Sequence, residues 1–157
     1  MNKIKLLVST LTLMVIASMS NIANAADTIG VANYKKIESE YNYAKKVYKD
    51  LDNKIVDLQQ FVIDKDKEFK AIESPIQKKN FEEKTQKEYK AKEDAIITLK
   101  AKKEDEIFNN IMSATNAVAK TRKIDVVLDY RVIFTGGIDI SDDVIQYLNT
   151  RPNPSKK

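Results

Sequence analysis

The residue types that most often do chemistry in proteins are scarce in this sequence. It contains no histidine and no cysteine, so the commonest general base, the thiol nucleophile and the best ligands for soft metals are missing. It also has no phosphate-binding loop, no nucleophile elbow and no glycine-rich dinucleotide motif. We therefore expect no enzyme, no cofactor and no bound metal.

One acidic stretch, from Asp139 to Asp143, has the spacing of the start of a calcium-binding loop. The sixth position of such a loop must be glycine and the twelfth must be glutamate. In this chain those positions are Val144 and Thr150. The sequence therefore argues against a calcium site.

Charge is the other chemical feature of the sequence, and the excess of positive charge lies in the middle of the chain. Residues 65–103 contain 12 lysines and 8 acidic residues, whereas the stretches on either side are balanced. Such an excess attracts acidic chains over a Debye length of about 8–10 Å; the alternative is an ordinary solvated helix surface. The residues that we assign to electrostatic steering are Lys65, Lys67, Lys70, Lys78, Lys79, Lys84 and Lys87.

The element that carries these lysines is predicted to be a very long helical hairpin. Between Gly30 and Gly136 there is no glycine and only one proline, Pro75, and these two residue types are the commonest helix breakers. We expect a hairpin over residues 34–123 with its tip near 72–76 and with Ser74 as the cap of the second helix. Its arms, at about 1.5 Å per residue, would be roughly 60–70 Å long.

A heptad pattern indicates how the two arms pair. In the first arm, apolar residues recur in alternating steps of four and three, which is typical of a coiled-coil seam. The second arm follows the heptad pattern less closely, because Thr85, Glu88 and Lys92 place polar residues at seam positions. We expect loose packing in the tip half and firmer packing near Ile107 to Val118. The seam of the first arm is expected at Ile37, Tyr41, Ala44, Tyr48, Leu51, Ile55, Leu58, Val62, Lys65, Phe69 and Ile72.

Several large apolar residues lie off this seam and would be exposed on a freestanding hairpin. Exposed apolar groups on a mobile arm suit weak, multi-point capture of unfolded chains. Alternatively, these residues pack against a third element or a neighbouring subunit. Both interpretations are also open for Phe108 and Met112, which lie off the seam as well. With the aromatic residues of the tip, the candidate client-binding set is Val56, Phe61, Ile63, Phe69, Phe81, Tyr89 and Ile97.

The chain ends are predicted to form one small β-rich assembly domain from residues 26–33 and 124–150. Strands are expected at 28–33, 124–129 and 131–134, followed by a turn at Gly136-Gly137 and a short helix over 142–149 capped by Ser141. The fold class is therefore α+β, with the hairpin inserted between the terminal strands. So small a core favours oligomerisation, with a candidate interface at Ile29, Val31, Val126, Leu128 and Ile133.

The first 25 residues have the pattern of a cleavable signal peptide. Lys3 and Lys5 precede an apolar run from Leu6 to Met19, and Ala23-Asn24-Ala25 is a small-x-small cleavage site. We expect export, and cleavage would lower the net charge from +4 to +2. Residues 151–157 are expected to form a disordered tail.

The two ends resemble the periplasmic Skp/OmpH-like chaperones. The resemblance covers the opening Ile29 to Ile37 and the closing Val127-Leu128-Asp129, Gly137 to Ile145 and Leu148-Asn149. It implies a homotrimer with three helical tentacles around a cavity, and an ATP-independent periplasmic holdase for unfolded outer-membrane β-barrel proteins. Anionic lipid or lipopolysaccharide is a further partner that it allows, and export argues against nucleic acid. The alternative is a non-chaperone coiled-coil structural or adaptor protein of the envelope.

Overall fold

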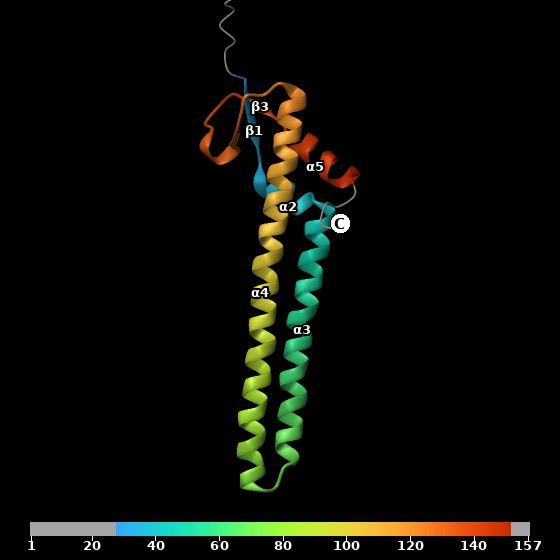
Figure 1. Cartoon of the computed structure of the whole chain (residues 1–157), viewed down its shortest axis with the longest axis vertical. Helices are drawn as coiled ribbons and strands as arrows, with labels where there is room; N and C mark the ends of the chain where they lie inside the picture. Colours follow the sequence, from blue (N-terminus) through green and yellow to red (C-terminus); the bar gives the residue numbers. More distant parts are fainter. Residues whose placement is uncertain (1–27, 152–157) are drawn as a thin grey trace, which may run out of the picture.

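The computed structural model describes residues 28–151, which are mostly helical with a small three-stranded sheet at one end (Figure 1). The predicted signal peptide and all but the first residue of the predicted tail lie outside the described residues. In chain order the elements are β1 (Ile29–Ala32), α2 (Tyr34–Glu40), α3 (Asn42–Ala71), α4 (Pro75–Arg122), β2 (Val126–Asp129), the 3₁₀ helix η1 (Tyr130–Val132), β3 (Ile138–Asp139) and α5 (Ser141–Thr150).

The sheet brings the two ends of the described chain together. Its strand order is β2-β1-β3, and β1 pairs in parallel with both neighbours. Gly137, just before β3, has a φ of +86°, and a Cβ atom there would clash with Cγ2 of Val31. Only glycine therefore fits this close approach of the chain to the central strand.

The two long helices run side by side in opposite directions, joined by the three residues Ile72, Glu73 and Ser74 (Figure 1). Pro75 is the first residue of α4, where its missing N–H leaves no helical hydrogen bond unmade. Ser74 occupies the cap position as predicted, but its side chain makes no capping hydrogen bond.

The first helix is not continuous, contrary to the sequence prediction. It is interrupted at Tyr41, whose ψ of 114° is extended, so that α2 and α3 are separate helices. Neither proline nor glycine stands at the break. The ring of Tyr41 is buried instead, only 2% exposed, within the core.

Two predictions for the C-terminal segment were also wrong. Residues 131–134 do not form a strand, because the Asp129 carboxylate accepts a hydrogen bond from the Arg131 N–H (2.9 Å) and turns the chain into η1. Ser141 is the first residue of α5 rather than its cap. Its hydroxyl accepts a hydrogen bond from the Asn33 N–H (2.9 Å) and donates one to Asp139 (2.6 Å). The hydrogen bond from Asn33, the cap of α2, holds the start of α5 against the start of α2.

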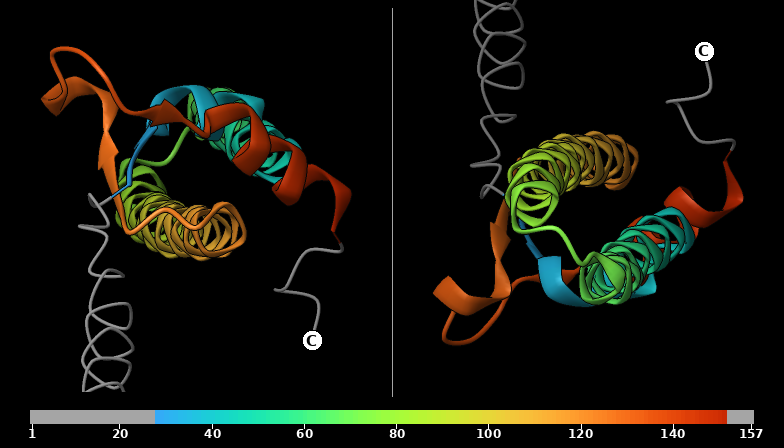
Figure 2. Two further views of the ribbon diagram at one scale, coloured as in Figure 1. Left: turned by 90° about the horizontal axis from the view of Figure 1, so that it is seen from above. Right: turned by 90° about the horizontal axis from the view of Figure 1, so that it is seen from below.

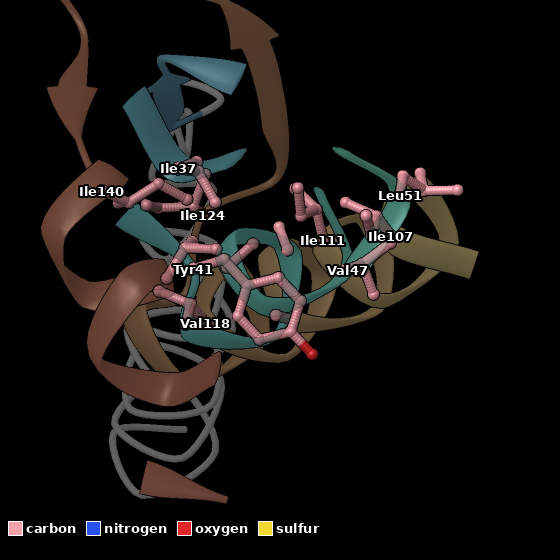
Figure 3. Close-up of a cluster of buried hydrophobic side chains, with 13 residues drawn as sticks. Ile37, Tyr41, Val47, Leu51, Ile107, Ile111, Val118, Ile124 and Ile140 are labelled. Carbon is pink, nitrogen blue, oxygen red and sulfur yellow. The ribbon is translucent and has the colours of Figure 1, made fainter. Parts of the chain in front are cut away.

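The buried core lies at the sheet end of the long helices, where side chains of α2, α3, α4 and α5 converge (Figure 3). Its last members along the arms are Leu51 in α3 and Ile107 in α4. Every residue from 52 to 106 is half-buried or exposed. We call residues 52–106 the distal arms, and residues 28–51 with 107–151 the base.

The long helices are too polar to cross a bilayer. Among residues 28–151, no helix has a stretch of sufficient length and hydropathy to span a membrane.

Candidate functional site

Two apolar hollows lie along the distal arms, between α3 and α4. Their volumes are about 680 Å³ and 860 Å³, and they share Val62 and Tyr89 in their walls. We call the two hollows together the distal groove. The hollow nearer the base is lined by Ile55, Leu58, Gln59, Val62, Ile63, Tyr89, Glu93, Ile96, Ile97 and Lys100. The hollow nearer the tip is lined by Phe61, Val62, Lys65, Asp66, Phe69, Lys79, Phe81, Glu82, Glu83, Thr85, Gln86 and Tyr89.

The groove exists because two helices alone cannot enclose their own apolar side chains. Ile55 and Val62 lie on the predicted seam, yet they are 44% and 46% exposed. Ile63 and Ile97, off the seam, are 50% and 59% exposed. Seam and off-seam residues therefore both expose apolar surface to solvent in these hollows, and exposed apolar surface of this kind marks interaction sites.

The two hollows differ in chemistry. Toward the base, the apolar side chains are aliphatic apart from Tyr89, and toward the tip they are mostly aromatic. The rings of Phe69 and Phe81 meet across the two helices with centroids 6.3 Å apart. A bound chain would therefore meet aliphatic contacts at one end of the groove and aromatic contacts at the other.

Lysine side chains cover the aromatic rings of the tip half. The ammonium group of Lys65 lies 5.7 Å from the ring centroid of Phe61 and 5.6 Å from that of Phe81. Lys92 lies 5.2 Å from the ring centroid of Phe61, and Lys78 lies 5.3 Å from that of Phe69. The hydrogen bond of Lys65 to Glu68 raises the pKa of that lysine, so it stays charged. Cation–π contacts at such exposed sites contribute about 0.5–1 kcal/mol each.

The walls of the groove are close to electrically neutral. Three lysines and four carboxylates line the two hollows, the lysines being Lys65, Lys79 and Lys100. Three other lysines of the predicted steering set form ion pairs within their own helix: Lys67 with Asp64, Lys70 with Asp66 and Lys84 with Glu88. Contact inside the groove would therefore be apolar rather than electrostatic.

Six of the seven predicted client-binding residues line the groove: Phe61, Ile63, Phe69, Phe81, Tyr89 and Ile97. Val56 does not, although it is 60% exposed. Phe61 was placed off the seam, but it is half-buried beneath Lys92 of the opposite helix. Ile55, Leu58, Val62 and Ile96 also line the groove. They were not predicted as binding residues, and the first three lie on the predicted seam, where burial was expected.

The base carries a further apolar hollow of about 800 Å³ beside β2. From the sequence, Phe108 and Met112 could either capture clients or pack against another element or subunit. Both residues line this hollow and not the distal groove. Of the residues predicted for an assembly interface, Leu128 lines this hollow, Ile29 and Val126 are exposed, and Ile133 is half-buried. Val31 is buried against Gly137 of its own chain, so it offers little surface to a neighbour.

Comparison with known proteins gives one result that bears on these surfaces. The family model described as outer membrane protein (OmpH-like) matches residues 28–148, which is most of the chain. No curated protein matches the sequence.

Proposed function

The chain belongs to the OmpH-like family of outer membrane proteins, and from this membership we propose that it is an ATP-independent periplasmic holdase. Its clients would be unfolded outer-membrane β-barrel proteins, held by the distal arms so that they do not aggregate. The family suggests binding of outer-membrane proteins and a periplasmic location. The distal groove is the observation in this chain that supports the proposal.

The groove suits an extended, unfolded chain better than a folded partner. From Ile55 to Phe69 the groove follows α3 for about 21 Å at 1.5 Å per residue, which is the length of roughly six residues of extended chain. Membrane-spanning β-strands alternate apolar with polar residues and place aromatic residues near their ends. A groove with an aliphatic half and an aromatic half is complementary to such a segment.

Assembly into a homotrimer is the second part of the proposal. The base hollow and the exposed side chains of Val132 and Phe134, at 72% and 104% exposure, are apolar surfaces that a neighbouring subunit would cover. Three pairs of arms around one cavity would place several grooves near the same client. Many weak contacts would then add to tight retention without nucleotide hydrolysis.

The competing function is that of a coiled-coil spacer or adaptor in the envelope. A spacer gains from a closed seam, whereas here the seam residues Ile55 and Val62 stand open in the groove. Binding of anionic lipid or lipopolysaccharide has less support than client binding, because the groove walls are near neutral.

The test compares two double variants in aggregation-suppression and client-release assays. Ile63→Ser with Ile97→Ser removes two aliphatic groups from the groove. Val56→Ser with Ile76→Ser removes two comparably exposed groups (60% and 74%) that do not line it. We expect the groove variant to release an unfolded β-barrel protein roughly tenfold faster, and the control variant to behave like the parent.

Two outcomes would count against the proposal. Equal release from both double variants would mean that the distal groove is not the client surface. Failure of the parent to suppress aggregation would favour the spacer function.

Added salt should slow capture more than it speeds release, because the lysine excess of residues 65–103 acts on the encounter and the groove contact is apolar.

A further inference from the structure

The break between α2 and α3 is the one place where the first arm could change direction relative to the base. A helix that stops and restarts leaves carbonyl groups at the end of the first helix and N–H groups at the start of the second without helical partners. Here α2 ends at Glu40, Tyr41 is extended, and α3 begins at Asn42. Those backbone groups need hydrogen-bond partners from elsewhere.

A single side chain from the far end of the sequence supplies one partner on each side of the break. The Oδ1 atom of Asn149, in α5, accepts a hydrogen bond from the Asn42 N–H (2.8 Å). The Nδ2 atom of the same residue donates to the Glu40 carbonyl oxygen (3.1 Å). A side-chain amide is suited to this position because it carries both an acceptor and a donor.

The other end of α5 is held to the start of α2. Ser141 accepts from the Asn33 N–H (2.9 Å), and Lys36 forms an ion pair with Asp142. Helix α5 thus contacts both ends of the short helix α2, and in the view from above it lies over the end of α3 (Figure 2). The angle at Tyr41 is therefore tied to α5, which also packs on α4.

We propose that Asn149 is a positioning residue that fixes the direction of α3, and with it the distal groove, relative to the base. Helix α4 runs unbroken from the tip to the base, so the break at Tyr41 decides how α3 lies against it. Helix α3 has 30 residues, extends about 45 Å and is joined to α4 at the tip by only three residues, so the angle at Tyr41 sets how α3 lies along α4. This inference concerns the geometry of the arms and holds whether or not they bind clients.

Spin-label distances and hydrogen exchange test it in the whole chain. The sequence contains no cysteine, so Lys54→Cys in α3 and Thr121→Cys at the base end of α4 give two unique labelling positions. Labelled chain is diluted with unlabelled chain, so that only distances within one chain are measured. We expect a narrow distance distribution in the parent and a broad one in Asn149→Ala, with exchange of the Asn42 amide faster by about fivefold or more.

Two further variants separate positioning from general stability. Asn149→Asp keeps the acceptor for Asn42 but loses the donor to Glu40, so we expect the Asn42 amide to stay protected while the distance distribution broadens. Gln146→Ala, at an exposed position of the same helix, should match the parent in both measurements. The proposal is overturned if Asn149→Ala leaves the distances as narrow as in the parent, even with a lower melting temperature. Should Asn149→Ala fail to fold, an unbroadened distribution in Asn149→Asp overturns it instead.

Discussion

The base and the distal arms are built from the same two helices and the same kind of apolar pattern, but only the base has a buried core. In the base, Ile37, Leu51, Ile107 and Ile111 are at most 5% exposed. In the distal arms the seam residues Ile55 and Val62 are close to half exposed. The difference is a third layer: α5 and the chain around the sheet pack on the helices in the base, and no other described element covers the distal arms. Heptad spacing predicts which side of a helix turns inward, but burial requires further elements around the helix.

A polar cluster joins a residue of the base to two residues of the distal arms. The Tyr43 hydroxyl donates to Glu106 (2.6 Å), and Lys103 donates both to Tyr43 (2.8 Å) and to Glu106 (2.7 Å). The hydrogen bond to Glu106 is the main reason why the pKa of Lys103 is raised. The charged and polar groups of these three side chains are thus satisfied by one another beside the core.

The largest expected contrast between the regions is in hydrogen exchange. Amides near Ile107 to Val118 should exchange only when the core opens, whereas amides of residues 65–92 need only a local opening of two helices. We expect the base to be protected by at least about 100-fold more, which corresponds to roughly 3 kcal/mol of opening free energy. Exchange measured by mass spectrometry on the intact chain tests this. Uniform protection along both arms would contradict the division into two regions and would favour a rigid spacer.

The sequence predicted much of this division but not its exact place. The polar residues Thr85, Glu88 and Lys92 correctly indicated a tip half without a buried core. Heptad spacing could not show that Ile55 and Val62 stay open, because it does not report how many layers surround a helix. The break at Tyr41 also escaped prediction, since its partner Asn149 is distant in sequence. The prediction of a strand at 131–134 failed because the turn that Asp129 forms with Arg131 prevailed over β-propensity.

A matched pair of truncations sharpens the comparison in free energy. Ile107→Ala removes a side chain that is fully buried in the base, so it should lower the free energy of unfolding by about 2–5 kcal/mol. Ile97→Ala makes the same chemical change where the side chain is 59% exposed, and should change the free energy by less than about 0.5 kcal/mol. Urea unfolding at one fixed protein concentration measures both, because assembly would make stability depend on concentration. Equal losses would mean that the distal arms are enclosed in the assembled protein.

A smaller expected contrast lies within the distal arms and tests what holds them together in place of a core. The ammonium group of Lys92 lies 5.2 Å from the ring centroid of Phe61 on the opposite helix. Lys92→Met keeps an unbranched apolar stem but removes the charge, so it should cost about 0.5–1 kcal/mol of stability. Lys90→Met, at an exposed position of the same helix, is the control for the loss of one positive charge. A double-mutant cycle with Phe61→Leu isolates the pair and should give a coupling of about 0.5–1 kcal/mol. A coupling near zero would show that Lys92 only lies over the ring, and that apolar contact alone joins the distal arms.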